Sequence, residues 1–177
     1  QEILIEGSKI LKSNNIKSFS LDSELLLSST LKIDRSDLIL NLEKKIKNNE
    51  TRIFFGAIAR RKKNEPIAYI IGYKDFWKNK FKVNKNVLIP RPDSETLVEQ
   101  VLNEISINSR KKILDIGTGS GCIIISILNE RKNCVGDGID ISKKAIKLAK
   151  YNAKIQHLKN RIKFFNTNID NFSLGKY

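Results

Sequence analysis

Hydrophobic positions in the first third of the chain recur at the three- and four-residue spacing of helices. Leu21, Leu25 and Leu26 fall on one helical face, and Ser20 just before them is a candidate N-cap. A second apolar face lies over residues 53–58. The pattern predicts that the chain opens with packed amphipathic helices.

Four basic residues follow the second apolar face, at 60–63. Cations suit the C-terminal end of a helix dipole, so this run needs no nucleic acid to explain it. Pro66 is expected to close the helical region, because helices rarely continue through proline. Residues 68–72 are rich in β-formers, so the residue pattern changes at Ala68. The sequence thus predicts a small helical domain over 1–72.

A short strand pair is predicted next, over residues 73–90. Its turn is rich in lysine and asparagine. The apolar positions on either side of that turn are Phe76, Trp77, Phe81, Val83 and 87–89. We interpret this segment as a β-hairpin connector between two lobes.

Two prolines mark the end of the hairpin segment. Pro90 and Pro92 each push the preceding residue out of the helical region, which predicts an extended stretch. Asp93 and Glu95 then place acids where the N-terminal dipole of a helix favours them. We expect this helix to extend to about Ile107.

From Lys112 onward, strand and helix patterns alternate. The expected strands are 113–116, 135–139 and 162–165, and the expected helices are 122–128 and one capped by Ser142 with Ala145, Ile146, Ala149 and Ala153 on one face. Gly136 and Gly138 should weaken the second strand. This order predicts the opening of a parallel, doubly wound α/β sheet.

The predicted sheet is short. Three strands fall below the average of about five to six strands in a sheet. The remaining segment, 166–177, is mostly polar. We therefore expect the domain to be truncated at its C-terminus, and the chain to be a fragment.

The charge balance is strongly basic, with a net charge of +14 from 25 lysines and 8 arginines against 19 acids. Such a balance can indicate an acidic partner such as nucleic acid. Phosphate-binding surfaces usually favour arginine, whose guanidinium contacts phosphate through two bonds. We interpret the lysine excess as compositional drift, and direct nucleic-acid binding is not favoured.

Cysteine and histidine are scarce. Cys122 and Cys134 are too few for a disulfide framework or a zinc site and indicate a reducing compartment. His157, the single histidine, is expected at the surface, and no ligand cluster predicts a metal. The sequence has no apolar run of about 18 residues and no leader after Gln1. We therefore expect a cytoplasmic protein.

The glycine turn after the 113–116 strand is the main candidate for chemistry. Gly117, Gly119 and Gly121 alternate between a strand and a helix, where the missing side chains let a ligand approach the backbone. Nucleotide-like ligands bind at the carboxyl ends of such strands. Asp140 ends the next strand and can accept hydrogen bonds from two ribose hydroxyls.

The spacing of the glycines limits which class of ligand the turn could bind. A dinucleotide fingerprint has glycine at its sixth place, where this chain has Cys122, and no Gly-Lys-Ser/Thr follows for a P-loop. Asp115, two residues before the first glycine, suits a cationic ligand better than a pyrophosphate. S-adenosylmethionine carries an ammonium and a sulfonium and no phosphate, so it is the predicted cofactor. The alternative is a glycine turn without a ligand.

Methyl transfer needs little acid–base machinery, because the sulfonium is a good leaving group. Catalysis is then a matter of aligning the acceptor with the S–methyl bond and excluding water. Cys122 opens an apolar helix and should be packed, so we do not expect it to be a nucleophile. No residue of the chain is predicted to be catalytic.

Four segments together resemble the peptide-chain release factor glutamine methyltransferases, the HemK-like (PrmC-like) family. They are EPIAYIIG at 65–72, FW at 76–77, LIPRPDSE at 88–95 and LDIGTGSG at 114–121. The Pro-Arg-Pro segment combined with the glycine turn is specific, whereas the turn alone indicates only the wider methyltransferase class. The first fifty residues match the family in helical character only.

The resemblance implies a fold and an activity. It implies a helical N-terminal domain over 1–72, a hairpin connector over 73–90, and over 91–177 the first part of a Rossmann-like class I methyltransferase domain. The family transfers a methyl group from S-adenosylmethionine to the side-chain amide of the glutamine in the Gly-Gly-Gln motif of class 1 release factors, in translation termination. The helical domain is expected to help recognise the release factor, and we expect a monomer.

The resemblance also implies a set of site residues. Residues 117–121 should cradle the methionine part of the cofactor, Asp140 should take the ribose, and Asn168 with Ile169 should flank the adenine. The cofactor-binding candidates are Asp115, Gly117, Thr118, Gly119, Ser120, Gly121, Asp140, Ile141, Asn168 and Ile169. The candidates for a substrate-side or structural motif are Pro90, Arg91, Pro92 and Glu95.

Two departures from the family pattern stand out. Asn168 occupies a position where the family usually has aspartate, although an amide oxygen can still accept from the adenine amino group. The family's Asn-Pro-Pro-Tyr motif, which holds the substrate amide, would begin beyond Tyr177. We therefore expect the chain by itself to be inactive and to bind the cofactor weakly or not at all.

Two other functions stay open. Nucleic-acid amino methyltransferases share an Asn-Pro-Pro-Tyr-type motif, and the net charge of +14 favours them, whereas the Pro-Arg-Pro segment and the helical domain argue against them. A binding module or non-catalytic fragment is the third hypothesis, because the catalytic motif is missing.

Overall fold

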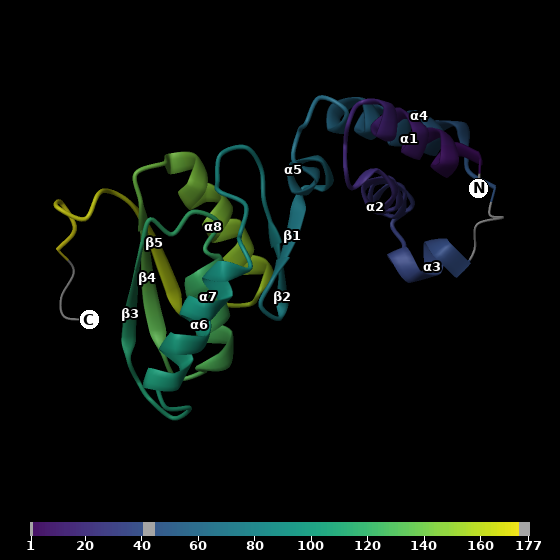
Figure 1. The fold of residues 1–177 in the computed structure, drawn as a ribbon. Helices are drawn as coiled ribbons and strands as arrows, with labels where there is room; N and C mark the ends of the chain where they lie inside the picture. Colours follow the sequence, from purple (N-terminus) through teal and green to yellow (C-terminus); the bar gives the residue numbers. More distant parts are fainter. Residues whose placement is uncertain (1, 41–44, 174–177) are drawn as a thin grey trace. The chain divides into compact units, whose positions relative to one another are not determined.

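The computed structural model describes residues 2–40 and 45–173 (Figure 1). It divides the chain into two compact units, Gln1–Ile71 and Gly72–Tyr177. The two outer predicted domains, 1–72 and 91–177, therefore each contain a few positions outside the described residues. The predicted connector lies within the second unit and packs with it.

Within the described residues, the first unit is helical, as predicted. Its helices are α1 (Glu2–Ser13), α2 (Phe19–Leu31), α3 (Arg35–Leu40), α4 (Asn48–Arg61) and α5 (Ile67–Ile71). Leu11, Leu27, Phe54 and Ile58 are fully buried at its centre. Gly7 lets α1 approach α4 closely, because a Cβ there would lie 2.6 Å from the Phe54 ring.

The cap predicted at Ser20 is wrong by two residues. The N-cap of α2 is Ser18, and Ser20 lies inside the helix, where its hydroxyl donates to Glu24. The predicted apolar face is also rotated, since Leu21 is 45% exposed. Buried Asp22 explains the rotation: it accepts from the Ser18 hydroxyl at 2.8 Å and turns its own side of α2 toward the interior.

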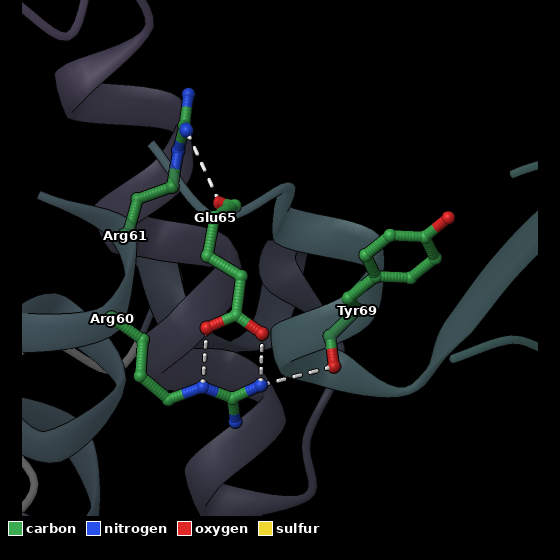
Figure 2. Close-up of polar contacts among 4 residues, drawn as sticks. All are labelled: Arg60, Arg61, Glu65 and Tyr69. Atoms are coloured by element: carbon green, nitrogen blue, oxygen red, sulfur yellow. Dashed lines mark hydrogen bonds and ion pairs between the residues drawn. The ribbon is translucent and has the colours of Figure 1, made fainter. Parts of the chain in front are cut away.

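The first two residues of the basic run are held in ion pairs within this unit, and Figure 2 shows the pair of Arg60 with Glu65. Arg60 binds the Glu65 carboxylate through two nitrogens, at 2.8 and 2.5 Å, and also donates to the Tyr69 carbonyl. Arg61 binds Asp22 at 2.6 Å and donates to the Glu65 carbonyl. These contacts tie the end of α4 to α2 and α5, so both arginines have a structural role.

The β-rich composition of residues 68–72 does not produce a strand. Residues Ile67–Ile71 form the short helix α5, whose first amides at Tyr69 and Ile70 donate to the Pro66 carbonyl. Proline is well tolerated at the start of a helix, because its fixed φ and missing N–H cost nothing there. Pro66 therefore begins a helix, and the apolar run behind it packs against the other helices of the unit.

The second unit contains a hairpin, a three-stranded sheet and three helices among the described residues. In chain order its elements are β1 (Tyr73–Phe76), β2 (Asn79–Lys82), α6 (Asp93–Glu104), β3 (Lys112–Ile116), α7 (Cys122–Glu130), β4 (Val135–Asp140), α8 (Lys143–Ile155) and β5 (Ile162–Asn166). The sheet order is β3-β4-β5 with both pairs parallel, which confirms the predicted α/β opening.

The helices of this unit lie on one face of the sheet (Figure 1). Their buried side chains form one core, to which α7 contributes Ile124, Ile125 and Leu128. The hairpin joins this core through Phe76 and Phe81, whose rings meet edge to face. The hairpin is thus part of the wall of the α/β unit.

Two element boundaries differ from the prediction. Helix α6 ends at Glu104 and not at Ile107, because Ile105 is extended and the Arg131 guanidinium binds the carbonyls of Leu102 and Ile105. Strand β2 ends at Lys82. The apolar residues behind it still belong to the interior, since Val83 and Val87 are buried without forming a strand.

The two glycines of β4 serve close packing. A Cβ at Gly136 would lie 2.6 Å from Ile124 Cδ1, and one at Gly138 would lie 2.6 Å from Phe164 Cδ1. The side chains of α7 and β5 therefore fill the space that β4 leaves. The prediction that these glycines weaken the strand misses this contribution to the core.

Gly138→Ala is expected to destabilise the protein by about 2 kcal/mol, because the added methyl group overpacks the contact with Phe164. Urea unfolding measures the change. Gly56→Ala is the matched control: it lies on α4 with nothing within 4 Å of its Cβ, and alanine favours a helix. Equal midpoints for the two variants would contradict the packing argument.

Candidate functional site

The glycine turn links β3 to α7 at the carboxyl end of the sheet. It is fixed to the neighbouring strand, because the amides of Gly117 and Thr118 both donate to the Ile139 carbonyl at 2.9 Å. A tight bond from the Gly121 amide to the Thr118 carbonyl, at 2.7 Å, closes the turn. The turn is therefore a rigid loop held from two sides.

The three glycines have different tasks. All adopt positive φ, at 72° for Gly117, 54° for Gly119 and 80° for Gly121. Beside Gly117 there is nothing within 4 Å of a built Cβ, and beside Gly119 only a backbone oxygen at 3.8 Å. At Gly121 a Cβ would meet Ile125 of α7 at 2.9 Å and Ala149 of the neighbouring α8 at 3.4 Å. The first two glycines thus leave open space for a ligand, and the third brings α7 close to its neighbours.

Asp115 lies at the base of the turn. Its Oδ2 accepts from the Thr118 hydroxyl at 2.7 Å. Burial raises the pKa of the Asp115 carboxyl and the nearby charge of Asp140 adds to the rise, while the Thr118 hydroxyl opposes it. Two carboxylates that repel each other across the strand ends would be stabilised by a cation between them.

Asp140 ends β4 and connects to both sides of the site. Its Oδ2 accepts from the Gly119 amide at 2.9 Å, and its Oδ1 accepts from the Ser142 amide at 2.8 Å. These bonds fix the carboxylate in one orientation. Each carboxylate oxygen has a second lone pair, so the group can still receive two ribose hydroxyls.

The other predicted cofactor residues follow the ends of β4 and β5. Ile141 is 80% exposed and Ile169 is 45% exposed, so both offer apolar surface to a ligand. Asn168 is exposed, and its side-chain oxygen accepts from the Asn171 amide at 3.0 Å. Ser120 is buried within the turn. The roles of these side chains toward a cofactor stay predictions.

Sequence reasoning missed Asn166, which joins two strand ends. Its side-chain amide donates to the carbonyls of Asp140 and Ile141, at 3.0 and 2.8 Å. It therefore holds the loop that carries the predicted ribose ligand. A polar residue at the carboxyl end of a parallel strand was the signal that could have found it.

Asn152 on α8 was also missed. It is completely buried, and its side chain accepts from the Lys82 amide at 2.9 Å and donates to the Lys82 carbonyl at 3.0 Å and the Ser120 carbonyl at 2.8 Å. It thus joins the hairpin to the glycine turn. Its signal in the sequence is an asparagine on the apolar face of a helix, where it would need partners.

Cys122 begins α7 directly after the turn. Burial raises the pKa of its thiol to about 11, and a neighbouring Ser120 hydroxyl lowers it only partly. At neutral pH the group is a protonated thiol, so it has little nucleophilic character. Cys134 is likewise buried and free.

The Pro-Arg-Pro segment leads into α6 and supports the hairpin. Pro90 is buried, Arg91 and Pro92 are exposed, and Pro92 forms the N-cap of α6. Glu95 in the first turn accepts from the Trp77 amide at 2.7 Å, which fixes the hairpin turn to this helix. In this structure the motif therefore has a structural contact, and its contact with substrate stays a prediction.

Histidine and clusters of metal-binding side chains were the other candidates for chemistry. His157 is exposed just after α8. Across residues 2–40 and 45–173, no group of three His, Cys, Asp or Glu side chains could hold a metal ion. In the same residues no helix has the length and hydrophobicity of a membrane span.

Two family models match the chain, one on each side of the hairpin. The model described as PrmC N-terminal domain matches residues 2–72, and the model described as methyltransferase domain matches residues 107–176. The first coincides with the helical unit. The second covers the sheet, the glycine turn and both strand-end acids.

The chain is also similar to curated proteins. It is 42% identical over 144 residues to the release factor glutamine methyltransferase of Coxiella burnetii. The aligned region covers 81% of this chain and 52% of that protein. It is 42% identical over 166 residues to the protein of the same name from Clostridium acetobutylicum, covering 94% and 58%. The chain thus spans about half the length of these relatives. The chain therefore combines a match to a PrmC N-terminal domain with a match to a methyltransferase domain, and over most of its length it is similar to proteins named release factor glutamine methyltransferase.

Proposed function

We propose that this chain is the cofactor-binding part of an S-adenosylmethionine-dependent protein methyltransferase. The acceptor is the side-chain amide nitrogen of glutamine in the Gly-Gly-Gln motif of class 1 release factors. The relatives named release factor glutamine methyltransferase support this substrate. The observation that carries the proposal is a PrmC N-terminal domain in front of a glycine turn flanked by two acids.

The residues of the turn fit the proposed cofactor. The open sides of Gly117 and Gly119 give the methionine portion access to the backbone, and Asp115 offers a charge to its ammonium group. Asp140 is oriented to receive the ribose, and exposed Ile141 and Ile169 suit the faces of adenine. When bound, the cofactor supplies a methyl group on a sulfonium leaving group.

The acceptor sets a separate requirement. An amide nitrogen is a poor nucleophile because its lone pair is delocalised, so the enzyme must orient the NH2 group in line with the methyl group. From the family resemblance we propose that an Asn-Pro-Pro-Tyr motif of the full-length protein performs this task. Such an enzyme works in the cytoplasm, where release factors act.

Mass spectrometry of a release factor incubated with the full-length protein and S-adenosylmethionine tests the proposal. The expected product is a gain of one methyl group on the Gly-Gly-Gln glutamine. A release factor whose motif reads Gly-Gly-Ala should gain none. Unmodified glutamine with the wild-type factor would disprove the proposed activity.

A nucleic-acid amino methyltransferase is the second candidate, favoured by the net charge of +14. The same reaction with DNA or RNA as acceptor distinguishes the two functions. A methylated base together with an unmodified release factor would establish the second function and exclude the first.

A further inference from the structure

The positive charge is unevenly distributed along the chain. Residues 142–169 contain eight lysines and arginines and no acidic residue. This segment of 28 residues therefore has a net charge of +8, more than half of the +14 of the whole chain. Drift toward lysine explains why lysine replaces arginine, but it does not explain why acids are missing from one segment.

The segment lines a groove of about 560 Å³ between α8 and β5, which is an edge strand among the described residues. Five lysines border the groove: Lys147, Lys150, Lys154, Lys159 and Lys163. Within the described residues none of the five forms an ion pair. Three of them repeat along α8 at intervals of three and four residues, where like charges destabilise a helix.

The floor of the groove is apolar. It consists of Ala153 on α8 and of Ile162 and Phe164 on β5, with Tyr151 at the side. Tyr151 is 39% exposed, and the Lys82 ammonium lies 4.5 Å from its ring centre. The groove therefore combines a ring of positive charges with a hydrophobic floor.

The arginine of the segment is not available to a ligand. The Arg161 guanidinium donates to the carbonyls of Leu128, Arg131, Lys132 and Cys134 at 2.8–3.1 Å. The groove thus presents only lysines, which act as point charges and lack the two-pronged contact that phosphate sites favour. Carboxylates around an apolar side chain match this surface better than a nucleic-acid backbone does.

We propose that the α8–β5 groove docks an acidic segment of the protein substrate, with an apolar side chain of that segment on the floor. This inference rests on the proposed function and adds a second contact to it. The groove extends to Lys159, which precedes β5, and to Ile162, which is the first residue of β5. The glycine turn lies at the opposite, carboxyl ends of the strands. The docked segment is therefore not the Gly-Gly-Gln loop itself.

Because the groove and the glycine turn lie apart, kinetics of the full-length enzyme can test docking separately from methyl transfer. Lys150→Glu/Lys154→Glu is expected to raise KM for an intact release factor about tenfold at low salt, since reversing two charges costs about 1.4 kcal/mol. The increase should shrink at 0.5 M salt because of screening. KM and kcat for a short Gly-Gly-Gln peptide should not change.

Lys111→Glu/Lys132→Glu is the matched control, because both lysines are exposed, lie outside the groove and make the same change in net charge. Surface plasmon resonance with the intact factor repeats the comparison without methyl transfer, so a failure of the proposed activity can be distinguished from a failure of docking. Equal effects of the two double variants would overturn the proposal. The proposal would also be overturned if single-stranded RNA displaced the release factor from the wild-type enzyme but not from the groove variant.

Discussion

Replacing Asp140 with alanine in the full-length protein is expected to weaken the binding of S-adenosylhomocysteine at least about 100-fold. The two ribose hydroxyls of the ligand would lose their hydrogen bonds to the carboxylate. Hydrogen bonds to a charged group contribute about 1.5–3 kcal/mol each. The Gly119 amide, which now donates to Asp140 at 2.9 Å, would also lose its partner, so the glycine turn would loosen. Isothermal titration calorimetry measures the change.

Two further substitutions separate charge from shape. Asp140→Asn keeps the size, but its NH2 group must face the amide of either Gly119 or Ser142, where two donors repel. We expect it to weaken binding at least tenfold. Asp170→Ala removes an exposed acid and should leave the affinity unchanged. An affinity for Asp140→Ala within threefold of the wild type would contradict the assignment of Asp140 to the cofactor.

Asn152→Leu is expected to have the largest effect on stability, about 3 kcal/mol. Leucine fills a similar volume, but it leaves the amide and carbonyl of Lys82 and the carbonyl of Ser120 without their bonds. Unpaired buried polar groups cost about 1–3 kcal/mol each. Because Ser120 belongs to the glycine turn, the affinity for S-adenosylhomocysteine should fall as well. Urea unfolding and calorimetry measure the two effects.

Gln156→Leu is the matched control for Asn152. Gln156 lies one turn further along and donates to the Lys80 carbonyl at 3.3 Å, so it also joins α8 to the hairpin, but in an exposed position. Water can replace this bond, and we expect a loss below about 0.5 kcal/mol. If the two variants lost equal stability, Asn152 would not be the link between hairpin and turn that the geometry indicates.

Local pattern was a reliable guide in the second unit. The apolar strand at 113–116, the glycine turn and the Ser142 cap were predicted and occur, since the Ser142 hydroxyl accepts from the Ala145 amide as a capping residue does. Parallel strands joined by helices have one favoured handedness, so the topology follows from the order of elements. The strand-end acids could be found for the same reason.

Local pattern failed where distant residues decide. The run 68–72 has a β-rich composition, yet it packs as a helix against the rest of the helical unit. The rotation of α2 depends on Asp22 and its pairing with Arg61, which is 39 residues away. No window of neighbouring residues contains that information.

The sequence by itself determined which residues form the candidate site. Glycines at positive φ and acids at strand ends follow from residue type and spacing, because backbone sterics and charge act locally. Only the tertiary structure decided which groups are joined. It placed Asn152 between the hairpin and the turn, committed Arg161 to backbone carbonyls, and gathered five lysines around an apolar groove. Those arrangements depend on packing between segments far apart in the chain, and a linear pattern does not contain their distances.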